Sequence, residues 1–196
     1  MFTGIIETLG ELKDVRTENG NVYLQVSSAL APELKIDQSL AHEGICLTVT
    51  HIEGDTHTVC AVPETIQKTS IGSWTAGRKI NLERCMLMNG RLDGHIVQGH
   101  VDTVGTCIKR IDEAGAWRFV FQFAPEFAHL LIEKGSVCIN GVSLTCFHVG
   151  ADSFEVTIIP YTYEHTSFKA MQVGQRVNLE FDVLGKYIAR FRELGR

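Results

Sequence analysis

The strongest constraint on the fold is an internal repeat at a constant offset of 97 residues. Ser39–Cys85 aligns with Ser136–Asp182 without a gap, and 15 of the 47 aligned positions are identical. A second offset, of 95 residues, places Gly4–Ile5 on Gly99–His100. Solenoid repeats have periods of about 20–50 residues, so a repeat of this length indicates two copies of one domain.

Each copy has the pattern of short strands. Apolar and polar residues alternate over residues 22–26 and 79–83, and Asp112–Gly115 lies between two further strand-like runs, which predicts a hairpin. A domain of this size with about six strands removes its sheet edges most simply by closing into a small barrel. We therefore predict an all-β chain with two tandem β-barrels, and we exclude a doubly wound α/β sheet.

Helix signals are few. Pro63 and Pro125 can each occupy the first turn of a short helix, where a missing N–H costs nothing. Residues 126–134 run to Gly135, which predicts a helix that ends there.

The tail of the chain predicts an amphipathic helix. Apolar residues recur there with helical spacing, at Leu184, Tyr187, Ile188, Phe191 and Leu194. A helix this short is not stable alone in water, so its apolar stripe must be buried. The stripe packs either on its own barrel or against equivalent helices of an oligomer, and the spacing does not decide between them.

Composition excludes several classes of protein. The 196 residues carry a net charge of −5 without a basic stripe, which argues against a nucleic-acid partner. No apolar run approaches the roughly 18 residues of a membrane helix. The start of the chain lacks a basic segment and carries Glu7, so we expect no secretory signal. The six cysteines form no C-x-x-C pair, which favours free thiols in a reducing cytoplasm.

Familiar nucleotide, metal and hydrolase motifs are missing. Gly72–Lys79 resembles a phosphate-binding loop, but its lysine is one position late and a predicted strand follows. His95 and His100 are five residues apart, which places them on opposite faces of a strand. The cysteines lack zinc spacing, and no Gly-x-Ser-x-Gly elbow occurs. The residues therefore give no support to a metal site or to a nucleotide-binding motif.

The repeat itself selects candidate polar positions. Alternation puts Cys46 and Thr48 on one strand face, and Ser143 and Thr145 on the matching face of the second copy. These side chains either fill the barrel interior or line a pocket. The copies also differ, because Cys46 aligns with Ser143 and Ile5 with His100. A duplicated pocket with altered side chains suits two similar ligands held in dissimilar roles.

Five segments in combination resemble the riboflavin synthase family over essentially the whole chain. They are Met1–Glu7, Gly44–Val49, Gly94–Asp102, Ile139–Thr145 and Asp182–Tyr187. The resemblance implies two six-stranded Greek-key barrels, residues 1–94 and 95–183, each of which binds a lumazine. It also implies that residues 184–196 form a helix that assembles a homotrimer, in which the N-terminal barrel of one subunit faces the C-terminal barrel of a neighbour.

The reaction implied by the resemblance is a dismutation of two 6,7-dimethyl-8-ribityllumazine molecules. One molecule donates a four-carbon unit to the other, which yields riboflavin and 5-amino-6-ribitylamino-pyrimidinedione without a cofactor or metal. Two related pockets suit this chemistry, because holding both rings in a near-attack arrangement replaces an encounter in solution. Lumazine synthase is a further partner that the resemblance suggests.

The resemblance also assigns roles to residues. Cys46 and His100 would assist addition to the lumazine ring and proton transfer from its C7 methyl group, and Ser39 would support them by hydrogen bonding. Histidine suits such a role because it both takes and gives protons near neutral pH.

Lumazine contacts are implied in both barrels. In the first they include His100 and Gly4, Ile5, Ile6, Cys46, Leu47, Thr48, Cys60, Ala61, Val62, Pro63, Glu64 and Thr65. In the second they are Lys134, Ser143, Leu144, Thr145, Ile159, Pro160, Tyr161, Thr162, Tyr163 and Glu164.

Two alternative functions remain at this point. The first is a carrier that binds lumazine or flavin on the same fold without turning it over; the presence of Ser39, Cys46 and His100 together argues against it. The second is a flavin-dependent oxidoreductase barrel, which would require flavin and nicotinamide, and no dinucleotide motif supports it.

Overall fold

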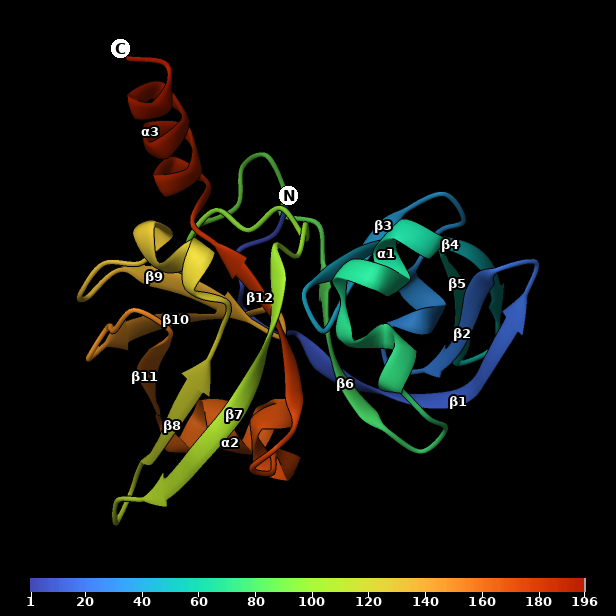
Figure 1. Cartoon of the computed structure of the whole chain (residues 1–196). Coiled ribbons are helices and arrows are strands. Elements are labelled where there is room, and N and C mark those ends of the chain that lie inside the picture. Colours follow the sequence, from blue (N-terminus) through green and yellow to red (C-terminus); the bar gives the residue numbers. More distant parts are fainter. Residues whose placement is uncertain (196) are drawn as a thin grey trace.

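The computed structural model describes residues 1–195 and consists of two closed six-stranded antiparallel β-barrels followed by a helix, as predicted (Figure 1). The first barrel contains β1 (Thr8–Glu18), β2 (Asn21–Ser27), β3 (Ser39–His42), β4 (Ile45–Glu53), β5 (Thr56–Ala61) and β6 (Lys79–Arg84). The second contains β7 (Thr103–Asp112), β8 (Trp117–Gln122), β9 (Ser136–Ile139), β10 (Val142–Phe147), β11 (Ser153–Ile158) and β12 (Arg176–Phe181).

Both barrels have the same strand order, which is that of a Greek key. In the first, β3, β4 and β5 are consecutive neighbours, and β6 returns to pair with β3 on its free side. In the second, β9, β10 and β11 repeat this pattern and β12 pairs with β9. Closure of each sheet leaves no unpaired edge strand, as the sequence-based argument required.

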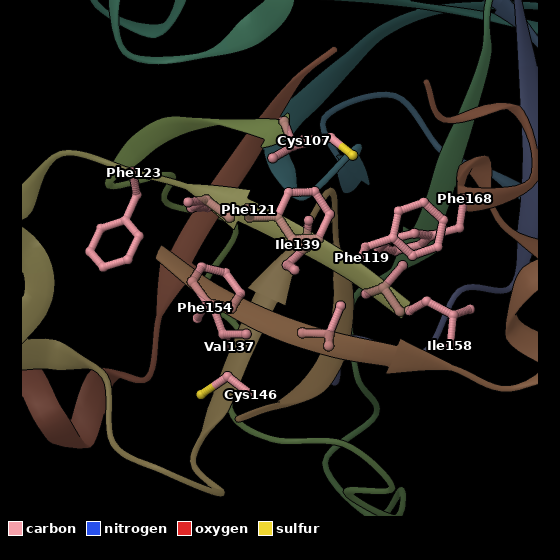
Figure 2. Packing of buried hydrophobic residues seen from close by; sticks show 14 of the residues in the cluster. Cys107, Phe119, Phe121, Phe123, Val137, Ile139, Cys146, Phe154, Ile158 and Phe168 are labelled. Carbon is pink, nitrogen blue, oxygen red and sulfur yellow. The ribbon is translucent and has the colours of Figure 1, made fainter. Parts of the chain in front are cut away.

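Each barrel has its own hydrophobic core, built by alternate residues of its strands. Leu24, Leu40 and Ile80 are among the fully buried side chains of the first core. The second core is richer in aromatic residues, and Figure 2 shows Phe119, Phe121, Phe154 and Phe168 packed together in it. The two repeats therefore share a topology but fill it with different side chains.

The helices that belong to the barrels are short, and each begins at a proline. α1 (Pro63–Lys68) and α2 (Pro160–His165) start on the proline pair that the repeat aligns, and both are followed by 3-10 turns, η2 (Ser70–Ser73) and η4 (Ser167–Ala170). A further 3-10 turn, η1 (Ala31–Glu33), follows β2. The predicted helix over 126–134 is wrong: the segment forms only a 3-10 turn, η3 (Pro125–Leu130).

The tail helix, α3 (Val183–Glu193), projects from the second barrel (Figure 1) and confirms the predicted element. Its first residue is one position earlier than expected, because Asp182 caps the helix by accepting a hydrogen bond from the Leu184 N–H. Arg196, which the expected tail included, lies outside the described residues. No helix within residues 1–195 has the length and apolarity needed to cross a membrane.

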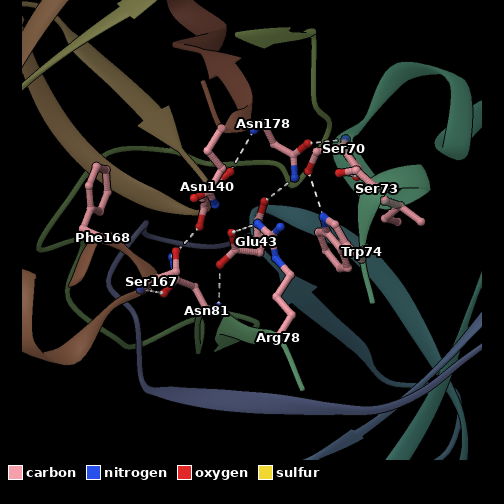
Figure 3. Close-up of polar contacts among 12 residues, drawn as sticks. Glu43, Ser70, Ser73, Trp74, Arg78, Asn81, Asn140, Ser167, Phe168 and Asn178 are labelled. Atoms are coloured by element: carbon pink, nitrogen blue, oxygen red, sulfur yellow. Dashed lines mark hydrogen bonds and ion pairs between the residues drawn. The ribbon is translucent and has the colours of Figure 1, made fainter. Parts of the chain in front are cut away.

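A reciprocal set of buried hydrogen bonds joins the two barrels (Figure 3). The Asn178 amide of the second barrel accepts from the Ser70 N–H and donates to the Glu43 carbonyl oxygen, at 2.8 and 2.9 Å. The Asn81 amide of the first barrel accepts from the Ser167 N–H and donates to the Asn140 carbonyl oxygen, at 2.7 and 2.9 Å. These residues are repeat equivalents, so the interface has approximate two-fold symmetry and fixes how the two barrels are oriented.

Candidate functional site

The repeated polar strands expose their candidate side chains on the outer face of each barrel. On β4, Leu47 and Val49 are buried in the core, whereas Cys46 is half-buried and Thr48 is exposed. On β10, Ser143 is half-buried in the same way. The alternative in which these small polar side chains fill the barrel interiors is therefore wrong.

A cavity of about 220 Å³, which we call pocket N, lies over the first barrel. It is lined by Ile45, Cys46, Glu64, Thr65, Lys68, Thr69, Gly99, His100 and Val101. Two of the three predicted catalytic residues, Cys46 and His100, thus line one pocket. Ser39 lies next to it on β3, opposite Thr48 in the β3–β4 register.

A second cavity of about 350 Å³, which we call pocket C, lies over the second barrel. Its lining consists of Lys134, Ser143, Leu144, Thr145, Phe147, Thr157, Ile159 and Thr162. Ser143 and Thr162 are the repeat equivalents of Cys46 and Thr65 in pocket N. The two pockets therefore share one repeat-related wall, with a thiol in pocket N and a hydroxyl in pocket C, while their other lining residues do not correspond.

Pocket N is completed by a segment that comes from the start of the second repeat. Gly99 has a φ of +80° and its carbonyl oxygen accepts a 2.9 Å hydrogen bond from the Cys46 N–H. The Glu180 carboxylate, on β12, accepts hydrogen bonds from the N–H groups of Gln98, Gly99 and His100 at 2.6–2.9 Å. Burial raises the pKa of Glu180 to about 6. This carboxylate holds His100 over the first barrel.

The second barrel is contacted in an equivalent way by the start of the first repeat. The Ser143 N–H of the second barrel donates a 2.8 Å hydrogen bond to the carbonyl oxygen of Gly4. Glu83, the repeat equivalent of Glu180, accepts from the N–H groups of Thr3 and Gly4. Each pocket is thus bordered by the opening segment of the other repeat, and Phe2 and Val97 pair where the two segments cross.

The Cys46 thiol has a modified electrostatic environment. Burial raises its pKa, and the Ser39 side chain opposes this shift by a hydrogen bond that favours the thiolate. Cys46 is therefore a protonated thiol at neutral pH, which suits hydrogen-bond donation better than nucleophilic attack. All six cysteines are free in the structure.

Several predicted contact residues lie away from the two pockets. Leu47 and Ala61 are part of the first core, and Ile6 packs against the second. Tyr163 is 8% exposed, stacks on Trp117 and is hydrogen-bonded by Arg110, so it does not line pocket C. Gly4 is buried and lies against Ser143. The remaining ones are exposed or half-buried outside the linings: Ile5, Thr48, Cys60, Val62, Pro63, Pro160, Tyr161 and Glu164.

One polar residue at pocket C was missed by the sequence analysis. The Nδ1 atom of His95 lies 2.6 Å from the Ser143 Oγ atom. The sequence carried a signal for it, since the five-residue spacing to His100 predicts that the two side chains point in opposite directions. Within residues 1–195, no group of three or more His, Cys, Asp or Glu side chains could hold a metal ion.

Comparison with known proteins gives concordant results. The family model described as "Lumazine binding domain" matches residues 3–85 and again 98–182. The riboflavin synthase of Bacillus amyloliquefaciens is 38% identical over 192 residues, which cover 97% of this chain and 89% of that protein. The riboflavin synthase of Mycobacterium bovis is 38% identical over 197 residues, covering 97% of each chain.

Solved structures match in fold. LumP complexed with riboflavin superimposes with a TM-score of 0.86 at 21% identity, covering 92% of this chain and 99% of that chain. LumP complexed with 6,7-dimethyl-8-(1'-D-ribityl) lumazine gives a TM-score of 0.84 at 19% identity, with the same coverage.

Proposed function

The chain belongs to the riboflavin synthase family, with two lumazine-binding domains, and on this premise we propose that it forms riboflavin from two molecules of 6,7-dimethyl-8-ribityllumazine. One lumazine gives a four-carbon unit to the other, which makes the enzyme a transferase. The second product is 5-amino-6-ribitylamino-pyrimidinedione.

The observation that carries this proposal is the pair of repeat-related pockets. A dismutation of one compound requires two sites that recognise the same ring yet treat it differently. Pockets N and C suit both conditions, because they share a wall on equivalent strands and helices, with Cys46 in one and Ser143 in the other, and differ in the rest of their linings. Orienting two rings against each other can contribute roughly 7–11 kcal/mol to barrier lowering at best.

Within pocket N, Cys46 and His100 are the proposed reacting groups. His100 is exposed to the pocket, while its backbone is fixed by Glu180, so its ring can reach a ligand from a rigid base. It would take the proton released by the acidic C7 methyl group of one lumazine. Cys46 would donate a hydrogen bond to the ring, and Ser39 would orient the thiol.

Assembly completes the proposal. Most apolar side chains of α3 are exposed in the single chain, including Ile188 at 68%, which supports the oligomer over docking on its own barrel. We take the assembly to be a homotrimer in the cytoplasm, in which pocket N of one subunit faces pocket C of its neighbour, and lumazine synthase to be a candidate partner.

The test is to mix the purified protein with 6,7-dimethyl-8-ribityllumazine and follow riboflavin by its absorbance. Conversion at two lumazines per riboflavin supports the proposal, whereas tight binding without turnover identifies a carrier. Cys46→Ala and His100→Gln should each lower the rate, and Cys107→Ala, a cysteine in the second core and outside both pockets, serves as the control. Full turnover by Cys46→Ala or His100→Gln at unchanged oligomer content would refute that residue's role.

A further inference from the structure

His95 is a buried histidine whose ring is committed to one hydrogen bond. It is 7% exposed, and its Nδ1 atom lies 2.6 Å from the Ser143 Oγ atom. Its Nε2 atom is buried and has no partner among the described residues. Burial lowers the pKa of His95, an effect that Asp182 opposes, so the ring is neutral at pH 7 and has one donor and one acceptor nitrogen.

The 2.6 Å separation is that of a hydrogen bond, and which group donates depends on the tautomer of the ring. If the Ser143 hydroxyl donates to the His95 Nδ1 atom, the ring proton is on Nε2 and the lone pairs of the Ser143 oxygen remain available to a ligand. If Nδ1 carries the proton, its N–H occupies one of those lone pairs instead.

Ser143 lines pocket C, whereas His95 contacts Ser143 and is not part of the lining. We propose that His95 is a positioning residue for pocket C, in which its Nδ1 atom takes the Ser143 hydroxyl proton in a hydrogen bond and aims the hydroxyl oxygen at an N–H or O–H group of the bound lumazine. This inference rests on the proposed function, because it takes lumazine to be the ligand of pocket C.

The backbone explains how one short segment serves both pockets. Residues 95, 97 and 99 are buried and residues 96 and 100 are exposed, so the segment is extended with alternating faces. A Cβ atom at Gly94 would lie 2.8 Å from the Ser143 Cβ atom, so only glycine allows the approach that brings His95 to Ser143. Five residues later, His100 lines pocket N. The segment thus places His100 in the lining of pocket N and His95 against Ser143 of pocket C.

The first experiment measures the tautomer of His95 in the wild-type protein, by ¹⁵N NMR of the histidine ring nitrogens. We expect a proton on Nε2 alone, and a change in the Nδ1 resonance in Ser143→Ala. A proton on Nδ1, or no response to Ser143→Ala, would overturn the inference. This measurement needs no turnover, so it stands even if the proposed function fails.

The second experiment measures lumazine binding at each pocket with ¹³C-methyl-labelled lumazine. Thr65→Val and its repeat equivalent Thr162→Val assign the bound signals to pockets N and C. We expect His95→Phe to weaken binding at pocket C by about tenfold with pocket N unchanged, and His95→Asn, which retains a hydrogen-bonding group, to recover most of the loss.

A double-mutant cycle separates positioning from a general structural effect. If His95 acts through the Ser143 hydroxyl, the variant with both His95→Phe and Ser143→Ala should bind no more weakly than Ser143→Ala alone. Additive losses, equal losses at both pockets, or unchanged binding in His95→Phe would each overturn the proposal. Unaltered binding at pocket N shows in the same sample that the variant is folded. A wild-type protein that binds no lumazine would instead refute the proposed function.

Discussion

The Cys46 N–H donates a hydrogen bond to the carbonyl oxygen of Gly99, so the strand that carries the pocket thiol is paired with the segment that carries His100. The approach is close enough to exclude any side chain. A Cβ atom at Gly99 would lie 2.6 Å from the Cys46 Cβ atom and 2.9 Å from the ring of Phe2. The relative position of the two proposed reacting groups therefore depends on a glycine.

We expect Gly99→Ala to displace His100 and to lower the rate of riboflavin formation at least tenfold. The matched control is Gly174→Ala, since Gly174 also has a positive φ, of +88°, but has no atoms within 4 Å of its added Cβ. Both variants bear a backbone strain of about 1–2 kcal/mol, which chemical denaturation measures. Only Gly99→Ala should also lose activity, and equal activity in the two variants would show that this contact does not position the site.

The sequence predicted most of the fold, because the evidence for it is local or repeated. Alternation identified β2 and β6, and the repeat predicted two domains before any strand was paired. The crossing of the opening segments was not predictable in the same way, since the Cys46–Gly99 and Ser143–Gly4 contacts join residues far apart in the chain. The 95-residue offset shows that these segments are equivalent without showing which barrel each one borders.

The different placement of two predicted contact residues has a physical explanation. Tyr161 and Tyr163 lie on α2, which has only six residues, too few for periodicity to distinguish an exposed side chain from a buried one. The structure exposes Tyr161 at 71% and buries Tyr163 against Trp117. Similarly, the composition of residues 126–134 favours a helix, but Lys134 has a φ of +65°, so the chain has already left the helical conformation there.

These two tyrosines give a second prediction. Tyr163→Phe removes the hydroxyl that Arg110 contacts and should lower the free energy of unfolding by about 1–3 kcal/mol, because a hydrogen bond to a charged group is lost. Riboflavin formation at a temperature well below unfolding should be unchanged. Tyr161→Phe, in which an exposed hydroxyl is removed, should leave stability unaltered. Urea denaturation of the three proteins is the measurement, and equal stability of Tyr163→Phe and wild type would contradict the structural role.

The third prediction concerns a histidine pair inside the first barrel. The Nε2 atoms of His42 and His57 lie 2.9 Å apart, and both side chains are fully buried. Burial lowers the pKa of His42 to about 3 and that of His57 to about 4. In the unfolded chain both pKa values return to about 6.5. Between pH 4 and pH 6.5 the unfolded state therefore binds more protons than the folded state. Stability present above pH 6.5 is therefore lost as the pH falls toward 4.

For His57 alone the loss is about 3 kcal/mol, from about 1.4 kcal/mol for each pKa unit. The control takes the residues at the equivalent positions of the second core, Ile139 and Phe154. The double variant with His42→Ile and His57→Phe should lose stability less steeply between pH 6.5 and 4 than the wild type. Buried glutamates contribute to both curves and cancel in the difference. Parallel curves would show that the pair is not responsible for the acid sensitivity.

The fourth prediction concerns α3. No residue of this helix is buried in the single chain, so deleting residues 184–196 should leave both barrels folded. If the apolar stripe packs against other subunits, its deletion removes the contact that holds the subunits together. Light scattering should then show monomers in place of trimers. Ile188→Glu should act in the same way by placing a charge on the stripe, whereas Arg190→Ala, off the stripe, should remain trimeric. A trimer that survives both the deletion and Ile188→Glu would place the assembly surface elsewhere on the barrels.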